Sequence, residues 1–171
     1  MKAFFKAFLI RFAELLVINC VLSAIVTAAF SAGELLSTQW IPIALILSAN
    51  AVFLALQWAR LRVLCFEVQD IRLYFKIALA SYAAFAVVHF AFLAAGIIGG
   101  DMTLYTWLFI MAKLVSIAMN FAISPAVSNL ISAIVFELLG LGIIFLAPLH
   151  RTVPDEEERI PLDRDVQDFK R

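Results

Sequence analysis

Two charged side chains lie deep inside apolar stretches of this chain, Lys113 in WLFIMAKLVSIAMNF and Glu137 in SAIVFELLGLG. A lysine at the centre of a membrane helix costs about 3 kcal/mol on insertion, and each neighbouring leucine, isoleucine or phenylalanine offsets about half a kcal/mol. The lysine stretch can therefore enter a membrane, but its charge should face protein or water rather than lipid. Intramembrane charges of this kind often line a substrate or ion path.

The residues between the two charges predict a bend that brings them together. Pro125 stands among serines and asparagines, which is turn chemistry, and the residue before a proline disfavours helix. Lys113 lies twelve residues before Pro125 and Glu137 lies twelve residues after it. At about 1.5 Å per helical residue the two charges reach the same depth. An antiparallel hairpin would bring the two charges together. We expect that they form a structural pair, that one or both face a partner subunit, or that they line a substrate or ion path.

Other polar residues recur within the apolar stretches. Asn120 follows Lys113 by seven residues and shares its predicted helix face, while His89 and Asn50 stand in the third and second apolar segments. Such residues serve helix packing in most membrane bundles, and otherwise they line a hydrated cavity. We expect His89 to be a buried, hydrogen-bonded imidazole. The candidate intramembrane polar site comprises Lys113, Glu137, Asn120, His89 and Asn50.

The elements that position these residues are long apolar segments. The chain has 171 residues, of which 64% are hydrophobic, and about 20 apolar residues suffice to cross a bilayer as a helix. We predict an all-α polytopic transmembrane bundle at 1–149, with a charged, irregular tail at 150–171. Its five apolar helices cover about Phe12–Ala32, Ile41–Ala59, Phe75–Ile98, Leu104–Ile123 and Val127–Leu149. We favour five full spans, with a re-entrant fourth segment and four spans as the alternative.

The basic residues predict the orientation of the bundle. Lysines and arginines stand before the first span and between the second and third spans, whereas GELLSTQW and GGDMT contain none. By the positive-inside rule the N-terminus is cytoplasmic, and we expect a bacterial-type inner membrane. The arginines and lysines of the tail also favour the cytoplasm, which conflicts with five spans and fits four.

No set of residues for catalysis or cofactor binding is visible. HExxH, GxSxG, Walker and GxGxxG motifs and Cys/His clusters are absent, so we expect no enzyme activity, no cofactor and no metal. A formal net charge of zero gives no basic field for nucleic acid.

Two function classes remain. We expect a non-catalytic subunit or assembly partner of a larger membrane complex, with a protein partner or a homo-oligomer in the lipid bilayer. The alternative is a small transporter or lipid flippase that handles an anionic substrate through Lys113 and Glu137. The two-plus-two helix layout is loosely similar to small flippases for lipid-linked sugars, although a fifth apolar segment departs from that layout.

Overall fold

The computed structural model describes residues 2–31, 40–68, 70–113, 116 and 124–150. Within these residues the chain is a helical bundle without strands, which confirms the predicted fold class. Its elements are α1 (Lys2–Ser31), α2 (Trp40–Val68), α3 (Ile71–Gly99), α4 (Thr103–Phe109), η2 (Ile110–Lys113), α6 (Pro125–Leu146) and η3 (Ala147–His150).

Four helices of the described residues are long and apolar enough to cross a membrane. They cover Phe4–Phe30, Ile43–Val68, Ile71–Gly99 and Pro125–Leu149, so the chain is a multi-pass integral membrane protein. Two of their boundaries have local causes. Asp70 caps α3 by accepting a hydrogen bond from the Arg72 backbone N–H at 2.8 Å, and Pro125 occupies the first turn of α6. The helix predicted from about Val127 begins two residues earlier, at Pro125, the residue predicted to lie in the bend.

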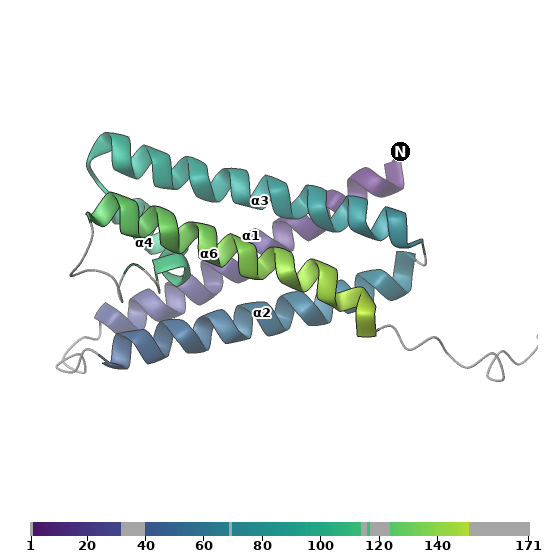
Figure 1. The fold of residues 1–171 in the computed structure, drawn as a ribbon, viewed down its shortest axis with the longest axis horizontal. Helices are drawn as coiled ribbons and strands as arrows, with labels where there is room; N and C mark the ends of the chain where they lie inside the picture. Colours follow the sequence, from purple (N-terminus) through teal and green to yellow (C-terminus); the bar gives the residue numbers. More distant parts are fainter. Residues whose placement is uncertain (1, 32–39, 69, 114–115, 117–123, 151–171) are drawn as a thin grey trace, which may run out of the picture.

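The long helices alternate in direction, so the bundle has two distinct ends. The start of α1, the junction of α2 and α3, and the end of α6 lie at one end, which we call the N-terminal end (Figure 1). The end of α3 and the start of α6 lie at the other, which we call the opposite end. The chain between α3 and α6 therefore leaves the opposite end and returns to it.

The segment predicted as a fourth helix at Leu104–Ile123 is interrupted. The α-helix α4 ends at Phe109, and the chain continues as the 3-10 turn η2 to Lys113. Because α3 ends and α6 starts at the opposite end, the chain between them is re-entrant (Figure 1). The preference for five full spans is not supported, and the four-span alternative fits the described helices. Irregular backbone at membrane depth is tolerated only where protein or a water-filled cavity surrounds it.

The core lies along the inner face of α3, which carries buried Tyr74, Ile77, Phe85 and Leu93. The outward faces are apolar instead: on α1 the exposed Val17, Val21 and Ile25 follow one another at steps of four. A surface of this kind suits lipid tails, as expected for a membrane span.

Candidate functional site

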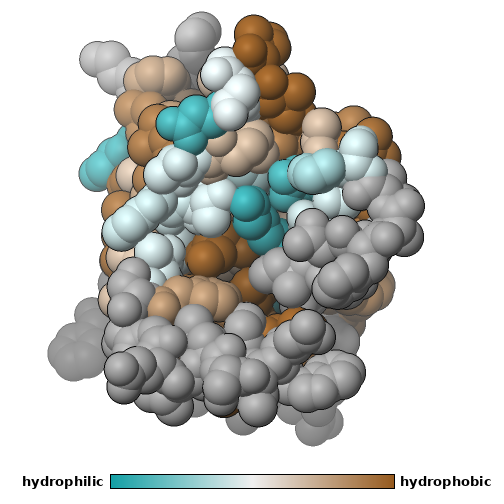
Figure 2. All heavy atoms as spheres, turned by 90° about the vertical axis from the view of Figure 1, so that its left-hand side faces the viewer, coloured by the Kyte–Doolittle hydropathy of each residue, from teal (hydrophilic) through white to brown (hydrophobic). Residues whose placement is uncertain are grey.

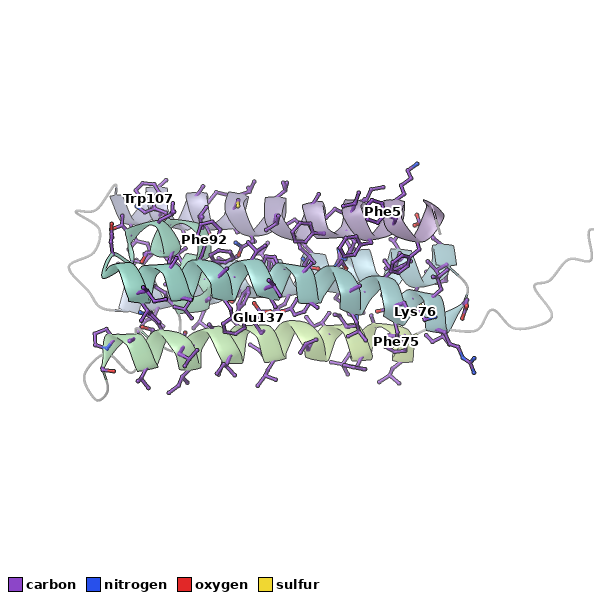
Figure 3. All side chains as sticks on the ribbon, turned by 90° about the horizontal axis from the view of Figure 1, so that it is seen from above. Phe5, Phe75, Lys76, Phe92, Trp107 and Glu137 are labelled. Atoms are coloured by element: carbon purple, nitrogen blue, oxygen red, sulfur yellow. The ribbon has the colours of Figure 1, made fainter. Side chains whose placement is uncertain are left out.

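Each long helix places one buried polar residue at a similar distance from the opposite end. Asn19 lies twelve residues before Ser31, and Asn50 lies ten after Trp40. His89 lies ten residues before Gly99, and Glu137 lies twelve after Pro125. At about 1.5 Å per residue these positions are about 15–18 Å deep, which is near the middle of a hydrocarbon core about 30 Å thick. We call Asn19, Asn50, His89 and Glu137 the polar layer, and Figure 3 shows Glu137 midway along α6, facing α3.

The centre of the polar layer is a pair formed by His89 and Glu137. His89 Nδ1 lies 2.5 Å from Glu137 Oε1, and His89 Nε2 lies 3.1 Å from the Tyr105 hydroxyl oxygen. The His89 side chain is fully buried and Glu137 is 6% exposed. Both ring nitrogens thus have a partner, which confirms the prediction of a buried, hydrogen-bonded imidazole. The imidazole of His89 can carry one proton, or it can carry two, with the second shared with the Glu137 carboxylate. Both states are possible because either ring nitrogen can donate.

Aromatic rings enclose the imidazole of His89. The ring of Phe109 stacks on it with centroids 4.5 Å apart, that of Tyr105 stacks at 5.7 Å, and that of Phe136 meets it edge-on at 5.7 Å. Such walls keep the local dielectric constant low, so a charge on the pair interacts more strongly than it would in water.

One carboxylate oxygen of this pair is unsatisfied. Glu137 Oε2 is buried and has no hydrogen-bond partner among the described residues. The Tyr82 hydroxyl donates to the Glu137 backbone carbonyl at 3.3 Å and so does not satisfy the side chain. A proton on Oε2 would neutralise the carboxylate without breaking the contact between Oε1 and His89.

The predicted ion pair between Lys113 and Glu137 is wrong. Lys113 Nζ donates to Thr106 Oγ1 at 2.6 Å and lies 6.0 Å from the centroid of the Tyr105 ring, while the carboxylate of Glu137 pairs with His89. The two charges would reach equal depth only if an α-helix continued through Lys113. The chain is already a 3-10 turn there, with a different rise and rotation per residue. Tyr105 contacts Lys113 and His89: its ring faces the ammonium of Lys113, and its hydroxyl meets the imidazole of His89.

Polar side chains on α1 and α2 hold the re-entrant segment by its backbone. Asn19 Nδ2 and Ser23 Oγ both donate to the Leu108 carbonyl, at 2.7 and 2.9 Å. Asn50 Nδ2 donates to the Met111 carbonyl at 3.0 Å and to the Ile46 carbonyl of its own helix at 2.8 Å. These donors satisfy carbonyls that the interrupted helix leaves open. Asn50 is therefore a positioning residue of the re-entrant segment.

A second set of contacts joins the re-entrant segment to α6. The Ser116 N–H donates to Ser132 Oγ at 3.2 Å, and the hydroxyls of Ser116 and Ser128 lie 3.1 Å apart. Asn120, the remaining predicted site residue, lies outside the described residues. The structure thus brings His89 and Glu137 together. Lys113 lies on the neighbouring re-entrant segment, and Asn50 on α2 bonds the backbone of that segment.

Sequence reasoning missed Tyr105, which links Lys113 to His89, and Asn19, which binds the re-entrant backbone. A signal for the His89–Glu137 pair was present, because both residues lie ten to twelve positions from helix ends that share one side of the bundle. The described residues contain no group of three histidine, cysteine, aspartate or glutamate side chains that could hold a metal ion. No family model, curated protein or solved structure matches this chain.

Proposed function

We propose that this chain is a small membrane transporter in which protonation of the His89–Glu137 pair is coupled to passage of an anionic solute near Lys113. The observation that carries this proposal is a protonatable pair buried at mid-depth, in contact with a re-entrant segment that reaches the same depth from one end. Ionisable residues inside membranes are costly and are typical of substrate and proton paths.

The charges around Tyr105 support a coupling between proton and anion. Among the described residues, the only hydrogen-bond acceptor of the Lys113 ammonium is the neutral Thr106 hydroxyl, so an anion there would supply the missing countercharge. Tyr105 contacts this lysine and also bonds His89. A change in the protonation of His89 alters which atom of that bond donates, and it therefore alters the preferred position of Tyr105 and α4.

A cavity at the opposite end supplies a route towards Tyr105, the residue that contacts Lys113 and bonds His89. It measures about 260 Å³ and is lined by Phe92, Ala95, Gly96, Gly99, Asp101, Leu104 and Tyr105. Figure 2 looks onto this end and shows hydrophilic residues gathered beside a hollow in its surface. At the mouth, hydrogen bonds from Thr103 lower the pKa of the Asp101 carboxyl. This ionised group attracts protons to the cavity.

The test is transport by purified protein in vesicles that contain a pH-sensitive dye. Gradients of inorganic phosphate, sulfate and citrate are imposed in turn, and the internal pH is followed. We expect at least one anion to move protons more than tenfold faster than in protein-free vesicles, and Glu137→Gln and Lys113→Gln to abolish this movement. Ser48→Ala is the matched control, because Ser48 is exposed and, within the described residues, bonds the Ala44 carbonyl of its own helix. Equal rates for wild type and both variants would contradict the proposal.

One observation favours the alternative of a non-catalytic subunit or assembly partner. Neither His89 nor Glu137 lines the cavity at the opposite end, and a space beside Phe136, at Asn50, Met111 and Ser132, measures only about 20 Å³. A space of that size holds about one water molecule. A partner that co-purifies in fixed stoichiometry, together with full complex activity of a Lys113→Gln variant, would support this second function.

We also propose a bacterial-type inner membrane with the N-terminus in the cytoplasm. In support, both described ends of the chain lie at the N-terminal end of the bundle, where Arg60, Arg62, Arg72 and Lys76 stand near the junction of α2 and α3. A fluorescent protein fused to the C-terminus should therefore fluoresce in the cytoplasm. An active alkaline phosphatase fusion at the same position would contradict this orientation.

A further inference from the structure

A second cavity lies at the N-terminal end of the bundle, between α1 and α2. It measures about 300 Å³, and each helix contributes four residues at positions i, i+3, i+4 and i+7. We call it the charged groove, and its lining residues are Ala7, Ile10, Arg11 and Glu14 on α1 and Arg60, Val63, Leu64 and Glu67 on α2. This spacing means that one continuous face of each helix borders the groove.

The inner part of the groove contains three charges that are tied together. Arg11 is 5% exposed, and its Nη1 donates to Glu14 Oε2 at 3.2 Å while its Nη2 donates to Gln57 Oε1. Arg60, which is half exposed, forms an ion pair with the other oxygen of Glu14. Two guanidinium groups thus share one carboxylate, and this part of the groove keeps a net positive charge.

The outer part of the groove contains Glu67. This side chain is exposed, and it forms no ion pair within the described residues. Glu67 lies seven residues after Arg60, about 10 Å along the helix axis and closer to the end of the bundle. The groove therefore presents positive charge towards the membrane core and negative charge towards the cytoplasmic or headgroup side.

We infer that the charged groove binds the head group of a zwitterionic phospholipid with a primary ammonium, such as phosphatidylethanolamine. A phospholipid places its phosphate deeper than its terminal amine, which is the order in which the groove places its arginines and Glu67. Guanidinium groups bind phosphate oxygens, and a carboxylate accepts hydrogen bonds from an ammonium. Ile10 and Val63 supply apolar contacts where the acyl chains begin.

The total charge of the groove distinguishes this head group from an anionic one. Two arginines and two glutamates sum to a formal charge of zero, so a neutral zwitterion completes both ends without leaving excess charge. An anionic lipid such as phosphatidylglycerol would satisfy the arginines but leave Glu67 without a cation. Phosphatidylcholine has a positive end without N–H donors and would not hydrogen-bond Glu67. This inference does not depend on the proposed transport activity, because the groove and the polar layer use different residues.

The test is lipid binding to the full-length protein in detergent, measured by native mass spectrometry. The probes are phosphatidylethanolamine, phosphatidylcholine and phosphatidylglycerol with identical acyl chains. We expect the wild type to bind phosphatidylethanolamine about tenfold more tightly than phosphatidylcholine. Glu67→Gln should remove this preference without weakening phosphatidylglycerol, whereas Arg60→Gln should weaken all three lipids.

Two controls separate the groove from general charge effects. Arg62→Gln removes an arginine on α2 that does not line the groove but stacks over Trp58, and Asp101→Asn removes an acid at the opposite end. Both should bind all three lipids like the wild type. Binding of the three lipids within twofold of one another, or an unchanged preference in Glu67→Gln, would overturn the inference. Glu67 is exposed, so its variant tests the site without a risk of misfolding.

Discussion

Two groups of charged and polar side chains stand at different depths in this bundle. The central one joins His89, Glu137 and Tyr105 at mid-depth, and the other joins Arg11, Glu14 and Arg60 at the N-terminal end. The side chains of His89 and Glu137 are 0% and 8% exposed, whereas those of the Arg60–Glu14 ion pair are 53% and 23% exposed. A charge in the Arg60–Glu14 pair is screened by solvent, whereas a charge in the buried His89–Glu137 pair is not. Loss of a partner should therefore have different effects in the two pairs.

The difference predicts how each group responds to loss of one partner. Removing one partner of a buried ion pair leaves an uncompensated charge and costs about 3–5 kcal/mol, while an exposed pair contributes about 0–1 kcal/mol. A rigid central group suits a site whose charge state must control packing. The more exposed group at the N-terminal end suits a site that exchanges partners with lipid.

The largest effect is expected at the centre. His89→Leu should lower the free energy of unfolding by about 3 kcal/mol or more, because Glu137 then lies buried without its partner. The double variant His89→Leu/Glu137→Leu should recover most of this loss, because no buried charge remains. Unfolding by sodium dodecyl sulfate in mixed micelles measures both. If His89→Leu lowered the free energy of unfolding by less than about 1 kcal/mol, the centre would be as tolerant of substitution as the group at the N-terminal end.

The second prediction concerns close packing behind the central pair. A Cβ added at Gly140 would lie 1.9 Å from the Tyr82 hydroxyl oxygen, whereas nothing lies within 4 Å of one added at Gly142. Gly140→Ala should therefore destabilise the protein by about 1–3 kcal/mol through overpacking. Gly142→Ala is the matched control on the same helix and should be neutral or stabilising, because alanine is the better helix former. Equal unfolding free energies for the two variants would contradict this close approach.

These differences also explain which features the sequence predicts. The four long helices follow from apolar length, and the start of α6 follows from Pro125, since both depend on local chemistry. The re-entrant path does not follow from local chemistry. Its apolar residues resemble a fifth span, and it is stabilised by Asn19 and Asn50, which are 89 and 61 residues away from the carbonyls they bind.

The candidate site was predicted in part for the same reason. Glu137 and His89 are recognisable as costly groups within apolar segments, so their burial and their importance could be predicted from residue type. The partner of Glu137 could not be predicted from residue type, because the choice between Lys113 and His89 depends on where α4 ends. The helix stops at Phe109, which directs Lys113 to Thr106 and leaves His89 facing the carboxylate.

The third prediction tests the donors that hold the re-entrant segment. Ser23→Ala alone should cost less than about 1 kcal/mol, because Asn19 still donates to the same Leu108 carbonyl. Asn19→Ala/Ser23→Ala together should cost more than the sum of the single changes, because the carbonyl then lies buried and unsatisfied. Asn50→Ala should cost about 1–2 kcal/mol, since the bond to the Met111 carbonyl is lost. Additive effects in the Asn19 and Ser23 cycle would contradict the shared carbonyl.

The smallest effect is expected at the N-terminal end of the bundle, with Arg60→Gln. The change should lower the unfolding free energy by at most about 1 kcal/mol, because Arg60 is half exposed and Glu14 keeps its bond to Arg11. The effect should shrink further in 0.5 M salt, at which exposed pairs are strongly screened. His89→Leu measured in the same two salt concentrations should show no such change, since its site excludes solvent. If the two variants lose equal stability or respond equally to salt, then depth in the bundle does not separate the two groups. The distinction between a proton site at His89 and Glu137 and a lipid site in the charged groove would then lose its physical basis.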